Sequence, residues 1–137
     1  MNYIIESIFV GFYSVTVYLF FSRFIYVSHQ NLYLLLLLVG FFKHFLGYIL
    51  NIHTWYCNNG IACLKIQDRK QKYIATSKNL LRDSILEAFA YLFLGFILQH
   101  IVKNVYLFFM IGFILHILSE KLKIHTYFCV NYCNKSK

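Results

Sequence analysis

The sequence has no proline, and charged residues make up only 13% of its 137 residues. Hydrophobic residues account for 60% of the chain and aromatic residues for 20%. Because a soluble domain of this length needs more polar surface, the composition excludes the soluble globular class and indicates an integral membrane protein. Proline and glycine are scarce while Phe, Tyr, Leu, Ile, Asn and Lys abound, which is typical of an AT-rich genome such as that of a mitochondrion or a large DNA virus.

The signatures of enzymes are also missing. The chain has no glycine-rich nucleotide loop, no motif of a hydrolytic nucleophile, no paired-carboxylate signature and no Cys-x-x-Cys motif. We therefore expect a non-enzymatic protein. The amino terminus lacks the basic segment of a signal peptide, since its only early charge is Glu6, so the first apolar run is expected to remain as a span.

Four apolar runs approach the roughly 20 residues that a membrane-spanning helix needs. They extend from Ser7 to Val27, from Leu32 to Leu50, from Ser84 to Val102 and from Val105 to Leu122. Very short links join the first run to the second and the third to the fourth, which predicts two antiparallel αα-hairpins. The predicted fold is thus an all-α integral membrane protein with four transmembrane helices.

The two predicted hairpins are related in sequence. Placing residues 40–57 over residues 112–129 without a gap gives nine identities in eighteen positions, and both segments end in Ile-His-Thr-aromatic-aromatic-Cys. We interpret this as a tandem duplication of parallel repeats within one membrane domain, residues 1–137. The first hairpin repeat covers residues 3–57, a basic connector 58–82, the second repeat 83–133 and a basic tail 134–137.

Most of the net charge of +8 lies on one face of the predicted bundle. Ten Lys and Arg residues flank the runs on the face that holds both termini and the connector, whereas only Arg23 and Lys103 lie on the opposite face. Basic residues gather on the cytoplasmic side of membrane proteins, so we expect both termini on the cytosolic side, or on the matrix side in a mitochondrion. Topology and anionic lipid explain this charge, and no nucleic-acid partner is expected.

Two predicted helical faces carry a histidine between small residues. They consist of Gly40, His44 and Gly47 in the second run and of Gly112, His116 and Ser119 in the fourth. Small residues at this spacing favour close helix packing, in which each histidine makes a hydrogen bond. The alternative is that His44 and His116 converge as axial ligands of a haem.

The repeated phrases contain a second candidate site. His53, Cys57 and Cys63 lie on the same predicted face as His125, Cys129 and Cys133. Two His-x3-Cys pairs could supply a tetrahedral zinc site that fastens the repeats together. Disulfides within or between the repeats, with three possible connectivities, and free thiols beside an interfacial aromatic belt are the alternatives.

Lys43 and Glu87 lie inside the predicted spans, where charged residues are rare. The sequence as a whole favours a structural or assembly component of a larger membrane complex, such as a respiratory complex or a virion membrane. Its partners would be the lipid bilayer and other membrane subunits or further copies of the chain. A membrane redox or metal-binding protein is the alternative, and a small channel or viroporin is the third hypothesis.

Overall fold

The computed structural model describes residues 2–26 and 28–137, and these residues are mostly helical. The four long helices are α1 (Tyr3–Ser22), α2 (His29–Ile49), α5 (Leu80–Leu98) and α6 (Val105–Lys121). Three short helices, α3 (Ile52–Asn59), α4 (Ile61–Leu64) and α7 (Ile124–Tyr132), and two short strands, β1 (Tyr73–Ala75) and β2 (Cys133–Lys135), complete the described chain. Val27, the predicted end of the first apolar run, lies outside the described residues.

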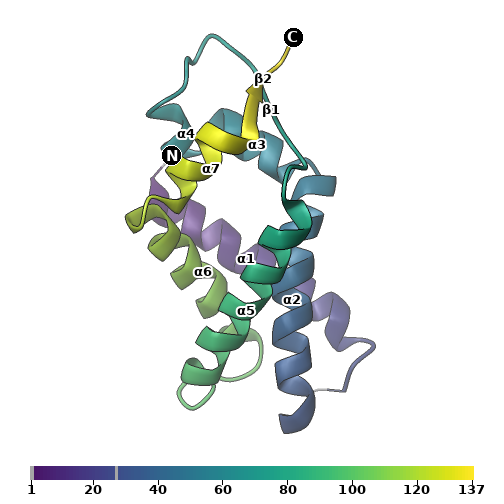
Figure 1. The fold of residues 1–137 in the computed structure, drawn as a ribbon. Helices are drawn as coiled ribbons and strands as arrows, with labels where there is room; N and C mark the ends of the chain where they lie inside the picture. Colours follow the sequence, from purple (N-terminus) through teal and green to yellow (C-terminus); the bar gives the residue numbers. More distant parts are fainter. Residues whose placement is uncertain (1, 27) are drawn as a thin grey trace.

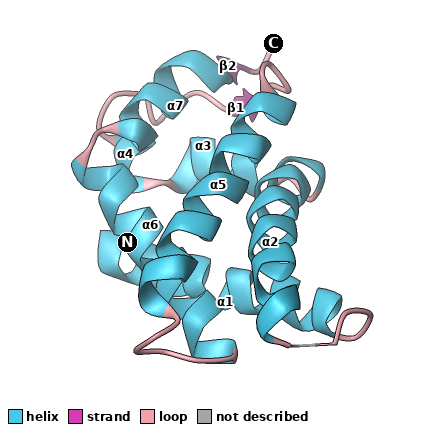
Figure 2. Cartoon of the chain, turned by 60° about the horizontal axis from the view of Figure 1, so that its bottom comes forward, coloured by secondary structure: helices cyan, strands magenta, loops and turns pink. Residues whose placement is uncertain are grey.

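The long helices form a bundle, and the short elements gather over one end of it (Figure 1). We call α3, α4, α7, β1 and β2 together the cap. Both termini lie at the cap, whereas the α1–α2 and α5–α6 links lie at the opposite end, which we call the loop end. Figure 2 shows that the small sheet is confined to the cap and that the rest of the described chain is helix and loop.

The long helices pair mainly across the two predicted hairpins. The most extensive contacts join α1 to α6 and α2 to α5, while α1–α2 and α5–α6 contacts are fewer. Two glycines account for this pairing. A Cβ on Gly40 of α2 would lie 2.7 Å from the Ala88 Cα of α5, and one on Gly112 of α6 would lie 3.0 Å from the Val10 carbonyl of α1. Only glycine lets these backbones approach so closely.

Two disulfides and a two-stranded sheet hold the cap together. Cys57 bonds to Cys133 and Cys63 bonds to Cys129, so both bridges join the first repeat to the second. The strands β1 and β2 are antiparallel, with Tyr73 opposite Lys135 and Ala75 opposite Cys133. The carboxyl-terminal residues, predicted to be a separate basic tail, thus include a strand that belongs to the cap. Its formation depends on the tertiary pairing with β1, which no local pattern reveals.

Two helices, α1 and residues Gln30–Ile49 of α2, are long and apolar enough to cross a membrane. The α6–α7 pair would be a third if it is taken as one span, although it bends by 77° at the break. Helix α5 is not among them, because three charged residues, Arg82, Asp83 and Glu87, lie in its first half. The described chain therefore contains two or three helices that could span a membrane.

Candidate functional site

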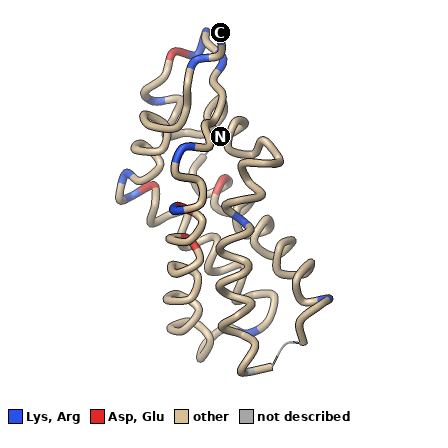
Figure 3. The backbone as a smooth tube through the Cα atoms, turned by 45° about the vertical axis from the view of Figure 1, so that its right-hand side comes forward, with Lys and Arg blue, Asp and Glu red and all other residues tan. Residues whose placement is uncertain are grey.

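A layer of buried polar side chains separates the apolar core of the bundle from the cap. The core towards the loop end consists of Val17, Tyr18, Leu35, Leu36, Val39, Tyr91, Leu107, Phe108 and Ile111. The cap has its own core around the two disulfides. Between the two cores lie two clusters of His and carboxylate side chains, each built from both repeats. Charged residues are concentrated in this half of the molecule (Figure 3).

The first cluster joins α2 to α5 through the carboxylate of Glu87. The Lys43 ammonium donates to one oxygen of this carboxylate, and Nδ1 of His44 lies 2.8 Å from the other. The His53 ring from α3 packs against the His44 ring with 4.8 Å between their centroids. Lys43 is 9% exposed and also lies over the Tyr91 ring at 5.6 Å. Glu87 is therefore held by two residues of α2, and the cap packs on one of them through His53.

The second cluster joins α1 to α6 through the carboxylate of Glu6, which is 3% exposed. One carboxylate oxygen lies 3.3 Å from Nε2 of His116, and the other accepts the backbone N–H of Ile61 at 2.9 Å. The His125 ring from α7 packs on the His116 ring at 4.3 Å. Glu120 lies 3.4 Å from Nδ1 of His125. Glu6 thus ties the start of α1 both to α6 and to α4 of the cap.

The alignment of the repeats matches the histidines of the two clusters. His44 corresponds to His116 and His53 to His125, and in each pair the cap histidine stacks on the bundle histidine. The aromatic residues that follow are also exchanged between the repeats. Phe128 of α7 lies 5.5 Å from the His53 ring, and its counterpart Tyr56 of α3 lies 5.3 Å from the His125 ring.

The packing between long helices follows the same relation. The two repeats open with Glu6-Ser7-Ile8 and Asp83-Ser84-Ile85. When these segments are aligned, Ser14 and Tyr91 occupy equivalent positions. These two residues hydrogen bond to each other through their hydroxyl groups, 2.5 Å apart. The glycines at matched positions, Gly40 and Gly112, each meet the opening helix of the other repeat. Equivalent positions thus make equivalent contacts across the centre of the bundle.

The cap histidines are held in their neutral form. Burial, and then the neighbouring His44, lower the pKa of His53 to about 3. Burial and the neighbouring His116 likewise lower the pKa of His125 to about 3. Burial and the Glu6 and Glu120 carboxylates raise the pKa of the Tyr56 hydroxyl above its usual range. Uncharged side chains at this level let the cap lie directly on the bundle without a further counter-ion.

The structure divides the predicted His and Cys set between two locations. All four cysteines are paired with each other, whereas His53 and His125 turn towards the bundle histidines. Among the described residues, no three His, Cys, Asp or Glu side chains are arranged to hold a metal ion. The His2Cys2 arrangement suggested for zinc is thus not formed here. His44 and His116, suggested as haem ligands, each contact the carboxylate of their own cluster.

The residues predicted to form packing seams have two different neighbours. Gly40 and Gly112 meet long helices of the other repeat, whereas a Cβ on Gly47 would lie 2.8 Å from Nε2 of His53 in its own repeat. Ser119, the counterpart of Gly47, is half-buried in α6. The predicted charges Lys43 and Glu87 are brought together as an ion pair. Glu6 was not predicted as a site residue, although it is a lone carboxylate in the first turn of a long apolar helix, where charged residues are rare.

Comparison of the chain with protein-family models, with curated proteins and with solved structures finds no match. The carboxylates of Glu6 and Glu87 each have a partner from another helix, and all four cysteines are used in bridges between the repeats. Such an arrangement fastens the long helices to one another and the two repeats to each other in the cap.

Proposed function

We propose that the chain is a non-enzymatic, multi-pass membrane protein that serves as a structural or assembly component of a larger membrane complex, such as a respiratory complex or a virion membrane. In this proposal α1, α2, α5 and α6 are four spans, arranged as two tandem hairpin repeats. The observation that carries the proposal is the distribution of side chains around the long helices. Besides the apolar core towards the loop end, they bury small and polar residues, and many of their large apolar side chains are exposed.

Helix α1 illustrates this distribution. Its buried residues include Glu6, Ser7, Gly11 and Ser14, whereas Phe9 and Phe12 on the outer face are more than half exposed. A soluble helix has the reverse arrangement, because water favours polar groups outside. In a bilayer the outer face meets lipid, and small residues inside allow helices to pack closely. The exposed faces of the bundle therefore suit a hydrocarbon environment.

The same argument supports α5 as a span. Its charged residues reduce its mean hydropathy, but Glu87 is turned inwards, where Lys43 and His44 compensate it. Its outer face presents Leu86, Phe89, Phe93, Phe96 and Ile97, all exposed. The spacing of these residues follows one side of a helix. Counting the charged residues of α5 treats Glu87 as if its side chain faced lipid. Its side chain is instead paired, and paired charges inside a helix bundle are tolerated.

An assembly role is supported by an apolar groove on the outer surface between α2 and α5. It has a volume of about 760 Å³, and its walls include Leu34 and Leu37 of α2 and Phe89, Phe93 and Phe96 of α5. Its lining is almost wholly apolar. Large aromatic side chains give a neighbouring membrane helix extensive surface for van der Waals packing. The groove is thus a suitable seat for a helix of another subunit.

The experiment that tests the role is blue-native electrophoresis of the native membrane after mild solubilisation. We expect the 16.4 kDa chain to migrate in a larger assembly. Replacing Phe93 and Phe96 by Ala should shift it towards the free protein, because both side chains line the groove. Replacing the exposed Phe9 and Phe12 on α1 is the matched control and should leave the assembly intact. A free monomer for the unmodified chain would refute the role.

We propose from the charge count that the cap lies on the cytosolic or matrix side. The disulfides argue for the other side, because disulfides persist mainly in oxidising compartments. The Asn134-Lys135-Ser136 sequon distinguishes the two, since Asn134 is exposed in β2 and N-glycans are added only on the lumenal side. We expect no mobility shift after glycosidase treatment of protein expressed in a eukaryotic cell. A shift that disappears in the Asn134→Gln variant would reverse the orientation.

A further inference from the structure

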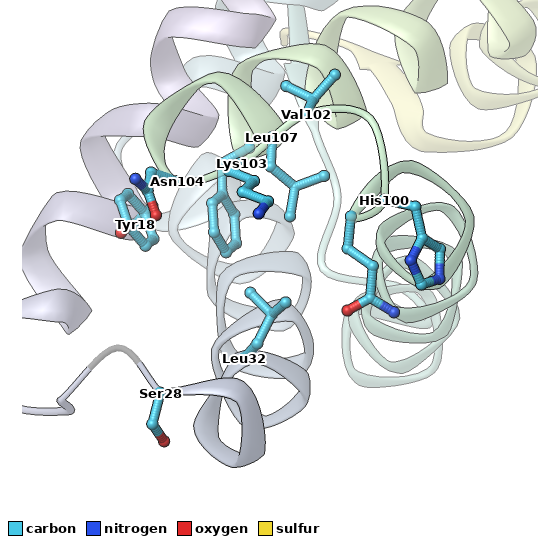
Figure 4. A pocket seen from close by; sticks show the side chains of 10 residues that line it. Tyr18, Ser28, Leu32, His100, Val102, Lys103, Asn104 and Leu107 are labelled. Atoms are coloured by element: carbon cyan, nitrogen blue, oxygen red, sulfur yellow. The ribbon is translucent and has the colours of Figure 1, made fainter.

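The loop end of the bundle contains a cavity of about 360 Å³ that the proposed assembly role does not use. It lies between the ends of all four long helices, on the side of the molecule away from the cap (Figure 4). Its apolar wall consists of Tyr18, Leu32, Leu107 and Phe108. Most of its polar residues come from the short link between α5 and α6, and Ser28 comes from the α1–α2 link. A cavity of this size holds a headgroup or a small organic molecule.

The polar side of the cavity is positively charged. Lys103 of the α5–α6 link directs its ammonium group into the space between Tyr18, Leu32 and His100 (Figure 4). Among the described residues, Lys103 has no ion-pair partner within 4 Å. His100 and Asn104 line the same cavity, and all three residues are exposed. An ammonium without a counter-ion in a cavity that also contains hydrogen-bonding groups is suited to an anion.

The acidic residues of the chain reinforce this charge by their location. The five acidic residues are Glu6, Asp68, Asp83, Glu87 and Glu120. None of them lies in residues 7–67 or 88–119, the two segments that supply every residue lining the cavity. Figure 3 shows the acidic positions in the half of the molecule that carries the cap. The segments that form the cavity therefore contain no carboxylate that could neutralise Lys103, and the electrostatic potential at the loop end is positive.

Two helix starts border the same cavity and add to this field. Ser28 caps α2 and Asn104 precedes α6, and both residues line the cavity. The Asn104 side chain does not cap its helix, which leaves the first-turn N–H groups of α6 without that acceptor. The positive ends of the two helix dipoles therefore lie near the Lys103 ammonium. The helix ends support the anion site, whereas the cavity and Lys103 define it.

We propose that this cavity binds the phosphate of an anionic phospholipid, with the phosphate at Lys103 and the glycerol and acyl region against the apolar wall. The proposal rests on the membrane location given above. A free phosphate ion would contact Lys103 but would leave the apolar side of the cavity, formed by Tyr18, Leu32 and Leu107, unoccupied. A ligand with a charged head and an apolar body uses both sides, and anionic phospholipids combine these properties in a membrane.

Native mass spectrometry of the full chain in a mild non-ionic detergent tests the proposal. The protein is titrated with phosphatidylglycerol or with phosphatidylcholine that has the same acyl chains. We expect phosphatidylglycerol to bind at lower concentration, and Lys103→Met to weaken its binding roughly fivefold or more, since one juxtamembrane lysine contributes about that factor. Lys103→Arg should restore binding, because it restores the charge.

Arg23 provides the matched control. It follows α1 at the link to α2, at the loop end, but does not line the cavity, so Arg23→Gln should leave phosphatidylglycerol binding unchanged. Equal losses in the Arg23 and Lys103 variants would overturn the site, since they would indicate only a general surface charge. Equal binding of phosphatidylcholine would also overturn it. Binding of inorganic phosphate alone with the same Lys103 dependence would overturn the assignment to a lipid.

The result is separable from the assembly role. A monomer on the native gel together with Lys103-dependent lipid binding would refute the assembly and leave the lipid site in place. An intact assembly without lipid selectivity would do the reverse.

Discussion

The Lys43–Glu87 pair allows a prediction whose magnitude follows from burial. Lys43 is 9% exposed, and the Glu87 side chain contacts both Lys43 and His44. In Glu87→Gln the shape of the side chain is kept, but the ammonium loses its counter-ion in the interior. Removing one partner of a buried ion pair destabilises a protein by about 3–5 kcal/mol.

Lys43→Met should be less harmful than Glu87→Gln. When the ammonium is removed, the Glu87 carboxylate still lies 2.8 Å from Nδ1 of His44, so it keeps a polar partner. In Glu87→Gln the ammonium loses its only ion-pair partner among the described residues, and the Tyr91 ring at 5.6 Å offers a weaker cation–π contact. We expect about 1–2 kcal/mol for Lys43→Met. The double variant should be more stable than Glu87→Gln alone, because it no longer contains the isolated charge.

The assay is thermal unfolding of the purified protein in detergent, followed by far-ultraviolet circular dichroism. A loss of 3–5 kcal/mol corresponds to a fall in Tm of roughly 10–20 °C for a chain of this length. Lys78→Met, at an exposed position before α5, is the control and should change Tm by no more than about 2 °C. Additive effects in the double variant, or a Glu87→Gln effect as small as that of the control, would refute the reasoning.

Four further perturbations have defined outcomes. Replacing Cys57 and Cys133 by Ser should destabilise the protein by about 3 kcal/mol in chemical unfolding, because the remaining bridge, separated by 66 residues rather than 76, already closes most of the loop. Since the pKa of His53 falls to about 3 on folding, its contribution to stability should be full above pH 6.5 and decrease as the pH falls towards 3, by about 2 kcal/mol at pH 5. His53→Phe should remove this share of the pH dependence and leave the similar share of His125, whose pKa is also lowered to about 3. Gly40→Ala should lower stability by about 1–3 kcal/mol in the same thermal assay, because its Cβ meets backbone atoms of α5 at 2.7 and 2.8 Å. Lys123→Asn should raise the free energy of unfolding by roughly 0.5–1 kcal/mol, and Tm with it, because Lys123 adopts a φ of 59° that asparagine tolerates better.

The pattern of the sequence predicts the elements of this fold better than their partners. The apolar runs correspond closely to α1, α2, α5 and α6, and the repeated phrases correspond to α3 and α7. Apolar length and helical spacing are local properties, so they can be read from one segment. The main pairing of α1 with α6 and of α2 with α5 depends on which small residue faces which backbone. The short links predicted that α1 would pack mainly on α2 and α5 mainly on α6. A short link brings two helices close but does not determine which helices make the tightest contact.

The candidate site shows the same division. The sequence identified His44, His116, Lys43 and Glu87 as unusual in their positions, and all of them lie in the polar layer. It did not identify Glu6 as the partner of His116, because the two residues are separated by 110 positions. Likewise four cysteines allow three pairings, and only the tertiary structure selects Cys57–Cys133 and Cys63–Cys129. Partners far apart in the chain are beyond any argument from local spacing.

The two clusters differ in one respect that identifies the more adaptable part of the site. The counterpart of Glu6 in the second repeat is Asp83, which pairs with Arg82 at 2.9 Å rather than with a histidine. The carboxylate that serves His44 is instead Glu87, one helical turn further along α5. The packing glycines keep the same contacts in both halves, so the close approach of the helices does not require this shift. Glu6 uses its second oxygen to hold the cap, whereas Glu87 uses its second oxygen to hold a lysine inside the bundle. The Glu6 arrangement is explained by its contact with the cap. The Glu87 arrangement adds the buried charge of Lys43, which holding the helices together does not require. A role beyond packing should therefore be sought first at the Lys43–Glu87 pair.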